Sequence, residues 1–146
     1  MLRFVLTSIV TVSAVLLSCK SEQGKKNLLP ALADSDSAIV MYYHTPGNPR
    51  FFNMTKVYDK AFIARFSETV NKKTIDAKDN CTTQGKIYFY GKKGAVETIY
   101  FSRADTCMTL SFIKTGEKYF VKMNKELKLS LDELEKNAIT LPAAGE

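Results

Sequence analysis

The sequence predicts one α+β domain: an antiparallel meander sheet of four to five strands packed on one long helix, followed by a short C-terminal helix. Two features predict it, an apolar stripe of helical period between residues 56 and 72 and two hairpins whose registers gather apolar side chains on one face. A length of 146 residues suits a single domain. With 45% hydrophobic and 25% charged residues, the composition excludes a disordered chain.

The N-terminus has the pattern of a secretory signal. A basic start, Met1-Leu2-Arg3, precedes an apolar run from Phe4 to Leu17. This run is short for the hydrocarbon core of a bilayer, which takes about 20 residues to cross. A basic tip, a short apolar run and a small residue are typical of a signal peptide, here residues 1–18.

The end of this run, Leu16-Leu17-Ser18-Cys19, resembles the lipobox of bacterial lipoproteins. The resemblance implies cleavage before Cys19 and acylation of Cys19 by chains such as palmitate. The implied location is the bacterial cell envelope, with the membrane as a partner. Two alternatives stay open: an uncleaved membrane helix and an ordinary cleaved secretory signal. The formal charge of +6 suits an anionic lipid or glycan, and nucleic acid is a poor partner for an exported chain.

Residues 19–36 are predicted to be the lipidated cysteine and a flexible tether. Their polar composition lacks helical periodicity, and a flexible chain of this length reaches roughly 20–25 Å. The globular domain is then expected over residues 37–141, with a tail over 142–146.

The domain begins with a strand and a helix. The β-branched and aromatic residues of 38–43 predict a strand, and 46–49 predicts a loop. Thr55 is a candidate N-cap for a helix over 56–72. Its apolar stripe repeats every four residues and consists of Tyr58, Phe62, Phe66 and Val70, with Ile63 beside them.

Two hairpins follow, and the turn of each sets its register. Gly94 suits the left-handed position of a three-residue turn, which places Phe89 opposite Glu97. The two-residue turn at 115–116 places Phe112 opposite Tyr119. The face expected to pack on the helix carries Ile87, Phe89, Ile99, Phe101, Leu110, Phe112 and Val121. The opposite face carries Lys86, Tyr88, Tyr90, Tyr100, Lys118, Phe120 and Lys122.

The last element is predicted to be a short helix over 131–137. Ser130 and Glu133 have the spacing of a capping box. The resulting order of strand, helix, four strands and short helix resembles the cystatin-like architecture in element order alone, and a fold does not by itself define a function.

Cys81 and Cys107 are predicted to form a disulfide. Alternate strands of an antiparallel meander start at the same end of the sheet, so both cysteines are expected at one rim. An oxidising compartment favours their bond. Free thiols and redox or metal chemistry are the alternatives, and the absence of a Cys-x-x-Cys motif disfavours the redox alternative.

The Lys- and Tyr-rich face is the best candidate for a binding surface. Tyrosine rings offer rigid amphipathic area and lysines offer charge, which suits a protein or an anionic cell-envelope glycan. Alternatively the last helix, residues 28–33 or a second copy of the chain covers this face. The sequence has neither a glycine-rich phosphate loop nor a metal-ligand set, so we expect no cofactor and no metal.

The sequence therefore predicts a lipid-anchored, exported lipoprotein that is a non-enzymatic binding or envelope-associated module. A structural scaffold is the main alternative, which requires a flat apolar patch. A small hydrolase using His44, the single histidine, is another. That hydrolase requires a pocket in which His44 lies beside a Ser, Thr or Asp, and no nucleophile-elbow motif is present.

Overall fold

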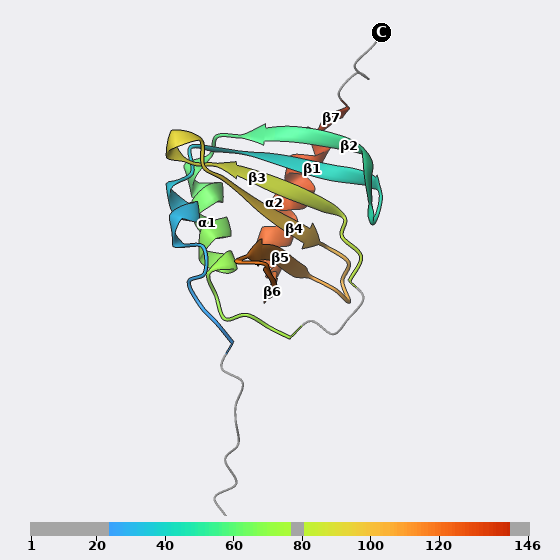
Figure 1. Ribbon diagram of the computed structural model, residues 1–146. Coiled ribbons are helices and arrows are strands. Elements are labelled where there is room, and N and C mark those ends of the chain that lie inside the picture. Colours follow the sequence, from blue (N-terminus) through green and yellow to red (C-terminus); the bar gives the residue numbers. More distant parts are fainter. Residues whose placement is uncertain (1–23, 77–80, 141–146) are drawn as a thin grey trace, which may run out of the picture.

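A seven-stranded antiparallel sheet, ordered β6-β5-β4-β3-β1-β2-β7, carries two α-helices on one of its faces (Figure 1). The computed structural model describes residues 24–76 and 81–140, so the predicted signal peptide and Cys19 lie outside the described residues. The elements are η1 (Pro30–Asp34), β1 (Ser37–Thr45), β2 (Asn48–Val57), α1 (Lys60–Val70), β3 (Gly85–Tyr90), η2 (Lys92–Gly94), β4 (Val96–Ser102), β5 (Thr109–Lys114), β6 (Glu117–Lys122), α2 (Lys125–Lys136) and β7 (Ile139–Thr140).

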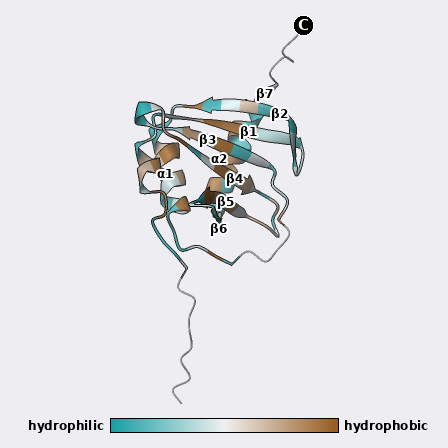
Figure 2. Ribbon diagram, viewed as in Figure 1, coloured by the Kyte–Doolittle hydropathy of each residue, from teal (hydrophilic) through white to brown (hydrophobic). Residues whose placement is uncertain are grey.

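The hydrophobic core lies between the sheet and the helices. Phe66 of α1 packs against Phe89 of β3 with ring centroids 5.1 Å apart, and both rings are fully buried. Hydrophobic residues line α1 and the central strands in Figure 2. All seven residues predicted for the helix-facing side of the sheet are buried, namely Ile87, Phe89, Ile99, Phe101, Leu110, Phe112 and Val121.

Both predicted hairpin registers are confirmed. Phe89 pairs with Glu97 across β3 and β4, and Phe112 pairs with Tyr119 across β5 and β6. Gly94 has a φ of +78°, the left-handed conformation that a residue without a side chain adopts at little cost. The turns thus set which side chains reach the core.

The predicted number of strands, four to five, is too low, because β2 and β7 extend the sheet beyond β1. Residues 46–49, predicted to be a loop, contain the turn of a β1–β2 hairpin, in which Thr45 pairs with Asn48. Gly47 has a φ of +80° after Pro46, which fits a type II turn. At the edge, β7 adds two residues next to β2.

The two helices also differ from their predicted bounds. Thr55 does not cap α1, since it pairs with Val40 inside the sheet. Instead the side chain of Asp59 accepts a hydrogen bond of 2.8 Å from Ala61 N, so Tyr58 precedes the helix and is 69% exposed. The predicted stripe holds from Phe62 onward.

The last helix begins earlier than predicted. The side chain of Asn124 accepts a 2.8 Å hydrogen bond from Leu127 N and caps α2, whereas the Ser130 hydroxyl donates to Glu126 O inside the helix. Leu127 and Leu131, one turn apart, are its buried residues. Among the described residues, none of the helices has the length and apolarity to cross a membrane.

Part of the predicted tether packs on the domain. Leu29 and Leu32 are 3% and 1% exposed and belong to the main core. Asn71 at the end of α1 binds both backbone groups of Leu29, each at 2.8 Å. The packed part of the chain therefore starts well before residue 37, the predicted boundary.

Candidate binding surface on the outer face of the sheet

The face of the sheet away from the helices, here called the outer face, has a Lys- and aromatic-rich composition. Strand pairing puts Tyr88 opposite Thr98 and Ser111 opposite Phe120, with core residues alternating between them. All seven predicted candidates lie on this face: Lys86, Tyr88, Tyr90, Tyr100, Lys118, Phe120 and Lys122. Residue pairing alone thus brings them together from β3, β4 and β6.

The outer face also has members that the sequence did not predict. The registers of β1 and β2 put Met41 next to Lys86 and Met54 next to Met41. The added residues are Ile39, Met41, Tyr43, Phe52, Met54 and Lys56. One continuous cross-strand row runs over six strands, through Met54, Met41, Lys86, Tyr100, Ser111 and Phe120.

This row is long enough for an extended ligand. Neighbouring strands lie about 4.8 Å apart, so the six members span about 24 Å. Tyr100 and Phe120 are half-buried and flank Ser111, whose small side chain is 7% exposed. Ser111, a small polar residue, therefore has one aromatic ring on each side.

Lysines on this face are held against aromatic rings. The ammonium of Lys86 lies 4.8 Å from the centre of the Tyr88 ring, and that of Lys118 lies 5.1 Å from the Phe120 ring. Partial burial lowers the pKa of Lys86, but the hydrogen bond to Tyr88 and the nearby phenols outweigh it, so the net pKa is raised. Burial has the opposite effect on Tyr43 and raises the pKa of its phenol, because burial disfavours the charged phenolate. Near neutral pH Lys86 therefore keeps its charged ammonium and Tyr43 keeps its neutral phenol.

The charges of the outer face have one sign. Lys56, Lys86, Lys118 and Lys122 occupy outer positions of the described strands. The only carboxylates within those strands, Glu97 and Glu117, occupy positions on the helix side. The local field therefore favours an anionic partner.

Neither intramolecular cover considered from the sequence lies on the outer face. The C-terminal helix α2 and the segment 28–33 contribute Leu127, Leu131, Leu29 and Leu32 to the core on the other side. Within the described ranges, 24–76 and 81–140, both helices pack on the helix side (Figure 1). A second copy of the chain remains as the alternative cover.

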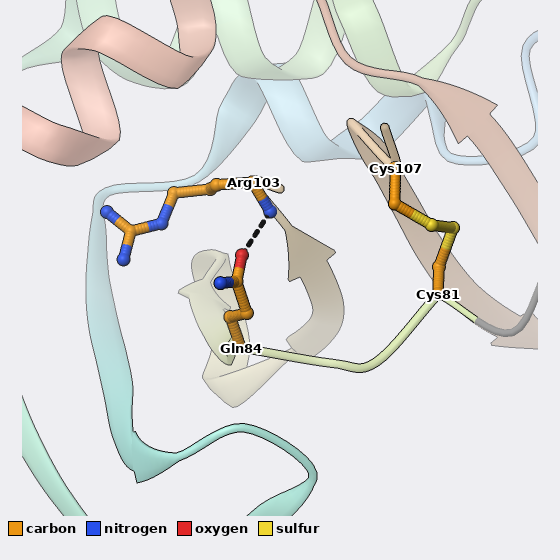
Figure 3. Close-up of a disulfide and its surroundings, with 4 residues drawn as sticks. All are labelled: Cys81, Gln84, Arg103 and Cys107. Carbon is orange, nitrogen blue, oxygen red and sulfur yellow. Dashed lines mark hydrogen bonds between the residues drawn. A yellow bond between two sulfur atoms is a disulfide. The ribbon is translucent and has the colours of Figure 1, made fainter. Parts of the chain in front are cut away.

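Cys81 and Cys107 are joined at one rim of the sheet, as predicted, with Cα atoms 5.5 Å apart (Figure 3). The bond links the segment that precedes β3 to the loop between β4 and β5. Close by, the side-chain oxygen of Gln84 accepts a hydrogen bond from Arg103 N (Figure 3). The disulfide and this hydrogen bond together connect the adjacent ends of β3, β4 and β5.

Arg103 connects this rim to α2, a role that no local pattern in the sequence predicts. Its guanidinium lies 2.7 Å from both Asp132 and Glu135, and only 12% of its side chain is exposed. It also lies 5.1 Å from the ring centre of Tyr42, whose hydroxyl donates to Leu131 O. These contacts hold α2 on the sheet, and the charge of Arg103 is paired with carboxylates of the same domain.

His44 is exposed near the end of β1, beside the turn of the β1–β2 hairpin. Its Nε2 is 2.8 Å from Oδ1 of Asn53, which also accepts from the Thr140 hydroxyl. An amide oxygen cannot take up a proton as a catalytic carboxylate does, so this contact is no proton relay.

A cavity of about 420 Å³ opens between α1 and α2 on the helix side. Its lining includes the apolar residues Phe62, Leu129 and Leu134 and the charged residues Asp59, Arg65, Glu126 and Glu133. His44 is not among the residues that line it. No cluster of three or more metal-binding side chains occurs in the described part of the chain.

Comparison with known proteins gives no relative: no protein-family model, no curated protein and no solved structure matches the chain significantly.

Proposed function

We propose that this protein is a membrane-anchored, exported binding module that captures an acidic glycan of the bacterial cell envelope on its outer face. The single observation that carries the proposal is the one-signed charge of that face, since its strand positions hold four lysines and no carboxylate. The resemblance of residues 16–19 to a lipobox supports the anchor on Cys19.

The aromatic residues favour a sugar polymer over a simple anion. Tyr88 and Tyr100 are diagonal neighbours on adjacent strands, half-buried and not needed to fill the core. A phenol offers both a flat apolar surface for a sugar ring and a hydroxyl for its substituents. A row of about 24 Å suits an extended chain better than a compact metabolite.

The test uses the full-length protein in detergent micelles and oligogalacturonate, which has a carboxylate on every ring, as the probe. The fully methyl-esterified oligomer is the neutral match. We expect calorimetric binding of the acidic oligomer that weakens as salt rises, because exposed charges are screened. We expect no binding of the ester.

Matched variants locate the binding. Tyr88→Ala with Tyr100→Ala, and separately Lys86→Gln with Lys118→Gln, should each weaken binding at least ten-fold, which is about 1.4 kcal/mol. Lys125→Gln with Lys136→Gln removes the same charge from α2 and should leave affinity unchanged. Equal affinity in all variants would contradict the proposal. Self-association through the face, with no oligomer bound, would favour a second copy of the chain instead.

A further inference from the structure

A second basic surface lies at the corner where the N-terminal chain enters the domain, away from the middle of the outer face. Residues 24–27 run beside residues 71–74, where Lys25 N donates to the Thr74 hydroxyl and Thr74 N donates to Lys25 O, both at 2.8 Å. Asn27 N continues the contact by donating to Asn71 O. In Figure 1 this blue segment passes beside the chain that leaves α1.

Four lysines meet at this corner. Lys25, Lys26, Lys72 and Lys73, here called the lysine corner, are all exposed. The Lys73 side chain lies against Gly24, since a Cβ added there would meet Lys73 Cγ at 2.8 Å. The two paired segments thus place their lysines around the point of chain entry.

Carboxylates offset only part of this charge. Lys25 forms a 3.1 Å ion pair with Glu117, and Glu68 lines a small cavity together with Lys72. Lys26 and Lys73 form no ion pair with a carboxylate of the described residues. The corner therefore keeps a net positive charge.

The packing of residues 24–36 shortens the connection to the predicted anchor. Only five peptide steps separate Cys19 from Gly24, so their Cα atoms lie at most about 17 Å apart. A flexible tether over the whole of 19–36 would let the domain turn freely. A connection this short brings the corner within reach of lipid headgroups, where a Debye length of about 8 Å leaves charges unscreened.

We propose that the lysine corner docks on anionic lipid headgroups and fixes the orientation of the domain on the membrane. The inference rests on the anchored part of the proposed function and is independent of the glycan. The predicted anchor carries more than one acyl chain and holds the protein on the membrane without the corner, so the basic patch adds attraction to anionic lipid that orients the domain.

The experiment is lysine footprinting of the full-length protein in vesicles of phosphatidylcholine alone and of phosphatidylcholine with phosphatidylglycerol. A water-soluble acetylating ester is applied briefly, and each lysine is quantified by peptide mass spectrometry. We expect Lys26 and Lys73 to react several-fold more slowly in the anionic vesicles, and high salt to restore their rates. Lys122 and Lys136 serve as internal controls and should react alike in both vesicles.

A matched variant separates docking from attachment. Lys26→Glu with Lys73→Glu should leave flotation with vesicles intact and abolish the slower labelling of Lys72 in anionic vesicles. Lys125→Glu with Lys136→Glu should leave that protection intact. Unchanged labelling of Lys26 and Lys73, or protection of Lys56, Lys86 and Lys122 instead, would overturn the inference. A chain that floats with neither vesicle would overturn the anchor and this inference, while glycan binding in micelles would stand.

Discussion

The two faces of the sheet consist of neighbouring residues of the same strands, yet they differ in almost every property. Along β3, Ile87 and Phe89 are fully buried under the helices, while Lys86, Tyr88 and Tyr90 between them stay partly exposed. The helix side is apolar with its carboxylates near strand ends, and the outer face mixes lysine with aromatic rings. One strand thus satisfies two different demands through a period of two residues.

The difference shows which residues the fold needs. A side chain on the helix side fills a volume set by its neighbours, so its replacement leaves a cavity. A side chain on the outer face has solvent on one side and can change without opening a void. Large aromatic residues at such positions expose apolar surface that the fold does not need, which favours contact with a partner.

The largest expected effect contrasts Phe89 with its neighbour Tyr88. Phe89→Ala removes a fully buried ring that packs against Phe66, so the free energy of unfolding should fall by about 3–5 kcal/mol. Tyr88→Ala should cost less than about 1 kcal/mol, the value of a cross-strand pair on an exposed face. Urea denaturation followed by circular dichroism measures both. Equal losses would mean that the outer face is covered in solution.

The disulfide at the rim comes next. Cys81 and Cys107 are 26 residues apart in the sequence, and closing such a loop contributes about 3.5 kcal/mol in the chain-entropy model. Cys81→Ala with Cys107→Ala should lower the free energy of unfolding by about this amount. Reduction of the unmodified protein is the control and should give the same loss. Alkylation of both thiols without a reductant would contradict the bond.

The helix-facing residues of β3 to β6 were predictable because local signals agreed. Gly94 and the turn at 115–116 set two registers, and each register independently gave one apolar face. The candidates on the outer face followed from the same alternation. Side chains alternate between the two faces of a strand, so assigning the apolar residues to the helix side also assigns the remaining residues to the outer face.

The β1–β2 hairpin escaped prediction because its hydropathy pattern is inverted. In β2 the polar residues Asn53 and Thr55 occupy helix-side positions, while Phe52 and Met54 occupy the outer face. A search for apolar residues facing the core therefore misses this strand. The turn Pro46-Gly47 was the one local signal that could have revealed it.

Long-range contacts had no local signal at all. Arg103 pairs with Asp132 and Glu135, and Asn71 binds Leu29, across separations that only the folded chain closes. The early start of α2 did have a signal, since Asn124 is a good N-cap with Leu127 three residues later. The more prominent Ser130–Glu133 pattern competed with it.

The pH dependence of stability offers another comparison of the two faces, because the consecutive residues Tyr42 and Tyr43 lie on opposite faces of the sheet. Burial raises the pKa of Tyr42, although the nearby charge of Arg103 opposes the shift, and burial also raises the pKa of half-buried Tyr43. An unfolded tyrosine ionises near pH 10, so the folded state keeps a proton that the unfolded chain has lost. The contribution of the neutral phenols to the free energy of unfolding is complete below about pH 10. The free energy of unfolding then falls as the pH rises toward the folded-state pKa.

Phenylalanine variants test this prediction. Tyr42→Phe also loses the 2.8 Å hydrogen bond to Leu131 O, so we expect a loss of about 1 kcal/mol at neutral pH. Its stability should then fall less steeply above pH 10 than that of the unmodified chain. Tyr43→Phe is the matched control, with a smaller change in slope because solvent reaches its ring. An identical alkaline slope in Tyr42→Phe would contradict the assigned burial.

The smallest effect is expected at His44, which belongs to neither the core nor the middle of the outer face. His44→Ala removes an exposed hydrogen bond to Asn53, so the free energy of unfolding should change by no more than about 0.5 kcal/mol. Binding of the acidic oligomer should also persist, since His44 lies in the hairpin beyond the cross-strand row. Asn53→Ala is the control for the same contact. Any hydrolytic turnover that His44→Ala abolished would refute the non-enzymatic function, because a side chain without a structural role would then be carrying chemistry.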